Sequence, residues 1–336
     1  MSSWRQVLIG LVPLLLVTQL SAEAKTFLEC KTLVQKVLSN DHEVLRAQQR
    51  LRTACMQKTQ SSIAADAAVT PCTSHNLPSA VADDREVMDA AEQLRDAELR
   101  ATSRAKQVYY RLQHAYAAQE LIRAQQGRLR DLLRVAEANY SAGKALQQDV
   151  LKSQVEISLM ETRATEAELE LHATESEINA MVGQKSLGEP VPAPPKETPH
   201  VLSLTIEKLG AKEDSTRSGA CEAKPTTTPK MIHKPDGARP CDDSQKGLAL
   251  EIRQLYLKAK AAEKLVDLYE RTILPQSRFA AYSSLVSYED GNTNFLNVLT
   301  SSTLAFEASM HCSEQNEELS LALVRLEELT GMELLD

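Results

Sequence analysis

Histidine, cysteine and carboxylate side chains could carry chemistry in this chain, but their spacing builds no catalytic or metal site. The seven histidines include neither an HxxxH nor an HxxH pair; they lie at positions 42, 75, 114, 172, 200, 233 and 311. Such pairs would place two imidazoles on one helix face, as a metal ion requires. The sequence also lacks a CxxC pair, a nucleophile elbow and a phosphate-binding loop. We therefore expect no enzymatic activity, no resident metal and no cofactor.

The carboxylate-rich stretch from Glu161 to Glu177 has two interpretations. It is typical of a solvated helix face. It could also line a pore, where a row of negative charge would favour cations. The sequence leaves both open.

Composition limits the classes of protein to which this chain can belong. It has 336 residues, a formal net charge of -8 and a pI near 5.5, which argues against a nucleic-acid partner. Aromatic residues are only 4% of the chain, too few for a large aromatic-lined ligand pocket. The abundance of Ala, Leu, Glu, Gln and Arg favours long helices instead.

The first 24 residues are typical of an export signal. Arg5 precedes an apolar run over 7–17, and Ala22-Glu23-Ala24 forms a small-x-small cleavage pattern. We expect residues 1–24 to be removed and the mature protein to be exported. An uncleaved anchor is the alternative, although the run is short for a bilayer span.

Helix breakers divide the remainder into long segments. Glycine is absent from 144–182, 248–290 and 292–330, and Gly127 is the only one in 86–142. In the segment 86–142 every seventh residue from Val87 is apolar, as in a coiled-coil seam. These residues are Val87, Leu94, Ala101, Val108, Ala115, Ile122, Leu129 and Ala136. A second seam follows the turn at Gly143: Val150, Ile157, Ala164, Leu171 and Ile178. Two such helices around a short turn predict an antiparallel helical hairpin.

The chain contains an internal repeat with an offset of 148 residues. Tyr140 and Gly143 match Tyr288 and Gly291, and the correspondence continues without gaps to Gly183 and Gly331. We predict an all-α fold of two long antiparallel coiled-coil-like hairpins in tandem. The first repeat, 25–183, holds a helix, a loop over 58–84 and a hairpin turning at 143. A Pro-rich linker, 184–246, leads to a second hairpin, 247–336, that turns at 291.

These segments resemble the TolC-type outer-membrane efflux proteins. Residues 140–151 and 288–299 are similar to the two hairpin turns of that family, and NDHEVL at 40–45 to the opening of its first helix. LYERTILP at 268–275 resembles the segment before the second turn, closest to the metal-efflux branch, and LEELTG at 326–331 the family's ending. The resemblance implies a homotrimer whose helices form a tube through the periplasm, with the glycine turns facing a periplasmic adaptor protein.

The same family carries a β-hairpin in each repeat, which together close a membrane barrel. In this sequence the corresponding segments, 58–84 and 184–246, contain no Phe, Tyr or Trp, and the second is rich in proline. We therefore expect the barrel strands to be missing or vestigial, with Pro-rich loops in their place.

Four cysteines lie in or beside these loops. Local pairs of Cys55 with Cys72, and of Cys221 with Cys241, would close the two loops in an oxidising compartment. Four cysteines allow three connectivities, so the pairing stays open.

The hairpin turns are the best candidates for binding a partner. The candidate residues are Tyr140, Gly143, Leu146, Gln147, Tyr288, Gly291, Asn294 and Phe295. Leu146, Gln147, Asn294 and Phe295 are expected on the exposed side, with Phe295 either anchoring a partner helix or packing the hairpin end. Two functions follow as hypotheses: a trimeric efflux duct that docks an adaptor, or a barrel-less periplasmic scaffold without transport activity.

Overall fold

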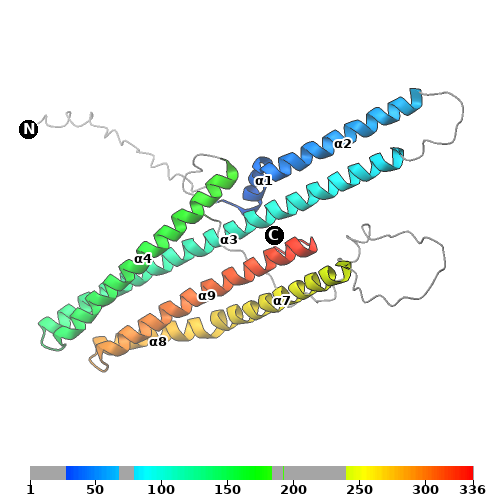
Figure 1. The fold of residues 1–336 in the computed structure, drawn as a ribbon. Coiled ribbons are helices and arrows are strands. Elements are labelled where there is room, and N and C mark those ends of the chain that lie inside the picture. Colours follow the sequence, from blue (N-terminus) through cyan, green and yellow to red (C-terminus); the bar gives the residue numbers. More distant parts are fainter. Residues whose placement is uncertain (1–27, 68–78, 184–191, 193–239, 336) are drawn as a thin grey trace, which may run out of the picture.

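A computed structural model describes residues 28–67, 79–183, 192 and 240–335. The described residues form helices joined by short turns and loops, with one isolated bridge between Leu28 and Pro192. The helices are α1 (Cys30–Asn40), α2 (His42–Ala67), α3 (Ser79–Ser141), α4 (Gln147–Val182), α7 (Pro240–Leu268), α8 (Leu274–Glu289) and α9 (Phe295–Thr330) (Figure 1). A π-helical turn, η2 (Tyr269–Ile273), joins α7 to α8. The all-α class and the paired hairpins are confirmed.

The first hairpin pairs α3 with α4. With 63 residues, α3 extends over about 95 Å. Its heptad row is buried along most of this length, from Ala101 to Ala136, because one face of the helix always meets a neighbour. On α4, Leu171 and Ile178 of the matching row are also buried.

The second hairpin pairs α7, η2 and α8 with α9. Pro275 lies in the first turn of α8, directly after the π-helical turn. A proline inside a continuous helix lacks the N–H donor and clashes with the preceding turn. The wider π-helical turn accommodates the proline without ending the rod.

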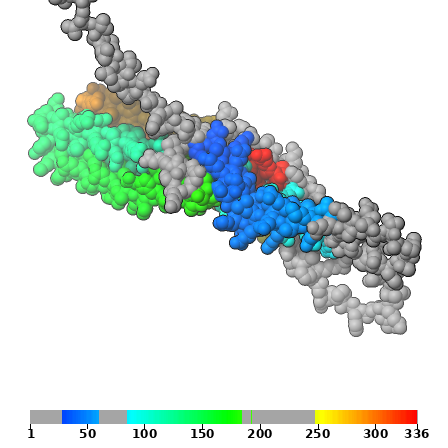
Figure 2. Space-filling view, turned by 90° about the horizontal axis from the view of Figure 1, so that it is seen from above, coloured from blue at the N-terminus to red at the C-terminus, as the bar shows by residue number. Residues whose placement is uncertain are grey.

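The two hairpins pack through α3 and α9, so the helices follow the order α4, α3, α9, α7–α8. An apolar cluster joins them near the turns and includes Ile122, Leu129, Met160, Val298 and Phe306. The molecule is elongated, with α4 along one end of α3 and α1 and α2 along the other (Figure 2).

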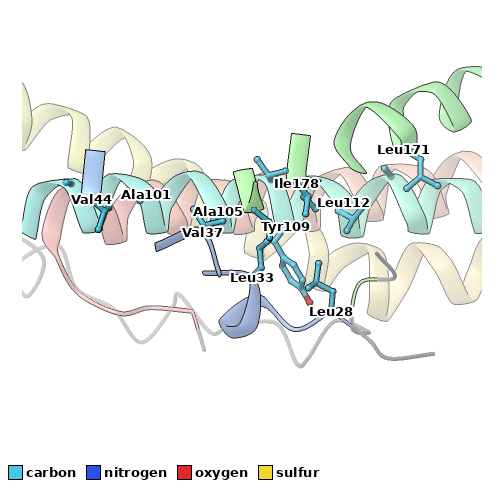
Figure 3. Packing of buried hydrophobic residues seen from close by; sticks show 14 of the residues in the cluster. Leu28, Leu33, Val37, Val44, Ala101, Ala105, Tyr109, Leu112, Leu171 and Ile178 are labelled. Atoms are coloured by element: carbon cyan, nitrogen blue, oxygen red, sulfur yellow. The ribbon is translucent and has the colours of Figure 1, made fainter. Parts of the chain in front are cut away.

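The helix α1 packs on the middle of α3, at the open end of the first hairpin. Leu33 and Val37 of α1 pack on Ala105 and Tyr109 of α3 (Figure 3). The Asn40 side chain, at the end of α1, donates to the carbonyl of Val182 at 2.7 Å. This contact ties α1 to the last turn of α4.

The predicted loop 58–84, linker 184–246 and signal peptide 1–24 lie only partly, or not at all, within the described residues. Helices extend into the expected loop 58–84, since α2 continues to Ala67 and α3 begins at Ser79, and α7 begins at Pro240 within the expected linker. The signal peptide, 1–24, and the remainder of both Pro-rich segments lie outside the described residues apart from Pro192, so the predictions on cleavage and on barrel strands stay predictions.

Candidate hairpin-tip interface

The turn of the first hairpin is built around Gly143. Its φ of 70° lies in the left-handed region that glycine adopts without a steric penalty. The N–H of Lys144 donates to the carbonyl of Asn139 at 2.8 Å, and the N–H of Gly143 to that of Tyr140 at 2.9 Å. This pattern satisfies carbonyls that the end of α3 would otherwise leave unpaired.

The turn of the second hairpin repeats this backbone 148 residues later. Gly291 has a φ of 75°. The N–H of Asn292 donates to the carbonyl of Ser287 at 2.8 Å, and that of Gly291 to Tyr288 at 3.0 Å. Both hairpins also end on left-handed glycines, Gly183 and Gly331. The repeat read from the sequence is therefore present in the backbone as well.

The helices leaving the two turns begin in related ways. The Asn294 side chain accepts a hydrogen bond from the N–H of Asn297 at 3.0 Å and so caps α9. Leu146 has no such group; instead its own N–H donates to the carboxylate of Asp149 at 3.4 Å. The first tip therefore presents an apolar side chain where the second presents an amide.

Three of the four residues expected on the exposed side of the turns are exposed, and Phe295 is the exception. Leu146 is 61% and Tyr140 48% exposed, and Gln147 and Asn294 are also exposed. Phe295, expected on the exposed side of its turn, is only 1% exposed, which corrects that expectation. Its ring packs edge-to-face on Tyr288 at a centroid distance of 5.8 Å.

The burial of Phe295 has a simple cause. It occupies the first position of α9, where its ring lies against Tyr288 near the end of α8. There it joins the apolar cluster that holds the two hairpins together. Of the two interpretations offered for Phe295, packing is the one that this burial supports.

The cysteine pairs lie partly outside the described residues. Cys55 is an exposed free thiol in α2, whereas Cys72 and Cys221 are not described. Cys241 lies in the first turn of α7. Both disulfide pairs stay predictions.

Polar groups that the sequence did not single out lie between the hairpins. Lys106 of α3 forms a buried ion pair with Glu327 of α9, at 2.8 Å. Nδ1 of His114 lies 3.0 Å from the Ser313 hydroxyl, and its Nε2 lies 3.8 Å from Glu317. Burial raises the pKa of Glu317, an effect that His114 partly opposes. The sequence holds no signal for these contacts, because no periodicity marks Lys106 or Glu327 as buried.

The described residues hold no group of three or more His, Cys, Asp or Glu side chains arranged for a metal ion. Within the same ranges, no helix combines the length and the apolar character needed to cross a membrane.

Comparison with known proteins identifies the fold. No protein-family model matches the sequence, and neither does any curated protein. Three solved structures resemble the chain over 90% of its length. The first is CusC, which forms a transmembrane channel; it is 13% identical, with a TM-score of 0.64, and the match covers 92% of its chain. The second is OprN, an outer-membrane channel, with 15% identity, a TM-score of 0.58 and 89% of its chain covered. The third is VceC, an outer membrane protein of Vibrio cholerae, with 14% identity, a TM-score of 0.58 and 96% of its chain covered. The resemblance to TolC-type proteins is thus confirmed for the fold.

Proposed function

We propose that this chain, with its TolC-type helical fold, is a periplasmic duct component of an efflux system. In this proposal it assembles as a homotrimer and docks a periplasmic adaptor protein through its hairpin tips. The similar solved structures are described as channels and outer-membrane proteins, which supports a place at the outer membrane. The export signal expected in 1–24 supports the periplasmic side.

One observation carries the proposal: the two hairpin turns have the same backbone and lie at the same end of the molecule (Figure 1). Each is held by a glycine, and each exposes a short segment of side chains, Leu146 and Gln147 on the first and Asn294 on the second. The paired tips at one end of the elongated molecule present a repeated surface to a partner protein.

The trimer is tested by sedimentation of the exported, oxidised protein. We expect a trimer, since two hairpins leave the tube incomplete in a single chain. A species that stays monomeric at high concentration would overturn the duct and favour the scaffold hypothesis.

Docking is tested by cross-linking at the tips. The exported protein would carry Leu146→Cys and be produced together with a periplasmic adaptor of an efflux pump. We expect a cross-link to the adaptor from position 146 and none from Ser176→Cys, an exposed position near the end of α4 that is far from the tip. Equal cross-linking at both positions would contradict docking through the tips.

A further inference from the structure

A histidine lies in the contact between the two hairpins, near the middle of α3. Nδ1 of His114 lies 3.0 Å from the hydroxyl of Ser313, and its Nε2 lies 3.8 Å from a carboxylate oxygen of Glu317. The side chains of His114 and Glu317 are 12% and 22% exposed, so solvent ions screen this contact only in part. Both ring nitrogens of His114 are therefore directed at groups of the other hairpin.

The protonation of the imidazole decides what this contact contributes. A neutral imidazole has one N–H and one unprotonated nitrogen, so it can share a hydrogen bond with Ser313 but brings no charge to Glu317. The imidazolium donates from both nitrogens, and its positive charge then faces the Glu317 carboxylate. Histidine is the side chain whose charge ordinarily changes between pH 5 and pH 8. Protonation therefore converts a neutral contact into an ion pair that joins the hairpins.

Carboxylates from α9 and α4 act on the same pair. Burial raises the pKa of Glu317, His114 opposes that rise, and Glu170 of α4 and Glu314 of α9 add to it through their negative charge. Arg111, one turn before His114 on α3, also opposes the rise. Its guanidinium is already held 3.1 Å from Glu177 of α4. The charge on His114 is thus placed among carboxylates whose nearest arginine has a partner of its own.

The helix α7, which packs on α9, brings a further carboxylate to this level. Lys258 of α7 pairs with Glu318 of α9 at 3.0 Å. Antiparallel helices advance about 1.5 Å per residue in opposite directions from such a contact, so Glu263 lies at about the height of Ser313. Glu263 is buried. Each of the helices packed around this level therefore contributes negative charge.

We propose that His114 is a pH-responsive contact within the fold, and that its protonation between pH 8 and pH 6 adds an ion pair with Glu317 that tightens α3 against α9. The two hairpins pack through α3 and α9, so this contact changes how firmly one hairpin is held on the other. A cation that gains a partner on folding adds stability, and that stability is lost as the pH rises and the proton leaves. The contact lies within one chain, so the proposal depends neither on a trimer nor on adaptor docking.

A double-mutant cycle tests the ion pair. The wild type, His114→Gln, Glu317→Gln and the double variant would be unfolded in urea at pH 6 and at pH 8. Glutamine keeps a polar group beside Ser313 but stays uncharged at both values. We expect the coupling between the two positions to change the unfolding equilibrium constant about threefold to tenfold at pH 6 and less than about twofold at pH 8. Coupling of the same size at both values, or none at pH 6, would overturn the proposal.

A second histidine provides a matched control. Nδ1 of His172 lies 3.0 Å from Glu175, but both residues belong to α4 and the His172 side chain is 62% exposed. This contact lies within one helix and in solvent, so the cycle of His172→Gln with Glu175→Gln should show at most about twofold coupling at either pH. Coupling as strong and as pH-dependent as at 114 and 317 would show a general property of histidine–glutamate pairs and contradict the role of the hairpin contact.

Hydrogen exchange locates the effect without relying on global unfolding. After correction for the intrinsic exchange rate, amides of α3 around 114 and of α9 around 313 should be protected several-fold more at pH 6 than at pH 8. The difference should disappear in His114→Gln. Amides of α2 are the internal reference, since its Arg50 bonds Gln93, well before His114 along α3. A rise of equal size in α2, or one that persists in the variant, would refute a local action of His114.

Discussion

Lys106 and Glu327, which lie in different repeats, form an ion pair of 2.8 Å with both side chains close to fully buried. Oε1 of Glu327 also accepts hydrogen bonds from the N–H groups of Leu334 and Leu335, at 2.6 Å each. Lys106 donates to the carbonyl of Leu335 as well, at 3.1 Å. The pair therefore fixes both the contact between the hairpins and the last residues described.

Removing one partner of this pair should be costly. Lys106→Met leaves the Glu327 carboxylate buried without its cation, and we expect a loss of about 3 kcal/mol in the free energy of unfolding. The double variant, Lys106→Met with Glu327→Met, should be more stable than the single one. Urea unfolding measures both. Arg104→Met, which removes a half-exposed ion pair with Asp41, is the control and should cost at most about 1 kcal/mol. A single variant as stable as that control would contradict the structural role of the pair.

Alanine at the turn glycines should weaken the hairpins. Gly143→Ala and Gly291→Ala place a Cβ at a positive φ, which costs about 1 kcal/mol at each site although the space around it is open. Gly127 offers a matched control inside α3, also with open space around the added Cβ. Gly127→Ala should instead stabilise the protein by about 0.5 kcal/mol. Thermal unfolding of the three variants gives the comparison, and turn variants as stable as the wild type would refute the assignment of the turns.

The two tip residues Phe295 and Leu146 should separate stability from binding. Phe295→Ala removes a side chain that is 1% exposed, and we expect a loss of about 3–5 kcal/mol. Leu146→Ala removes one that is 61% exposed, so the free energy of unfolding should change by less than about 0.5 kcal/mol. Chemical denaturation measures both. If Leu146→Ala proved equally destabilising, the tip would be part of the core rather than a surface for a partner.

Regular patterns in the sequence were sufficient to predict the long helices and the turns that join them. Val108, Ile122 and Leu129 are buried where the heptad row places them, because one seam must face a neighbour along the whole of α3. Gly143 and Gly291 turn the chain where a flexible residue interrupts two breaker-free segments.

The contacts between distant helices could not be predicted in this way. Lys106 and Glu327 are 221 residues apart, and neither is apolar, so no periodicity marks them as buried. Their burial depends on α3 and α9 being neighbours, which hydrophobic spacing within each helix does not determine. Phe295 was placed outside because it follows the turn closely, but its direction depends on the packing of α8 and α9.

The carboxylate of Glu317 should make stability depend on pH. Burial raises its pKa above the ordinary value of 4.5, so the folded protein binds its proton more readily than the unfolded chain. Stability from this group therefore falls as pH rises from about 4.5 through the raised pKa. Glu317→Gln removes the pH-dependent contribution of this carboxylate to the free energy of unfolding. The variant should therefore gain stability relative to the wild type as the pH rises from 4 to 7. Urea unfolding at both values measures it, with the exposed Glu120→Gln as control. An identical pH dependence in the wild type and Glu317→Gln would contradict the shift.

Thiol reactivity should rank the described cysteines by their surroundings. The thiolate is the reactive form, so a raised pKa and a buried sulfur both slow alkylation. Burial raises the pKa of Cys30 to about 11 and also raises that of Cys312, while Cys55 is exposed. In a reduced variant that keeps only these three cysteines, Cys55 should be labelled at pH 8 at least tenfold faster than the other two. Peptide mass spectrometry over time gives the three rates. Labelling of Cys30 as fast as Cys55 would contradict the packing of the start of α1 on α3.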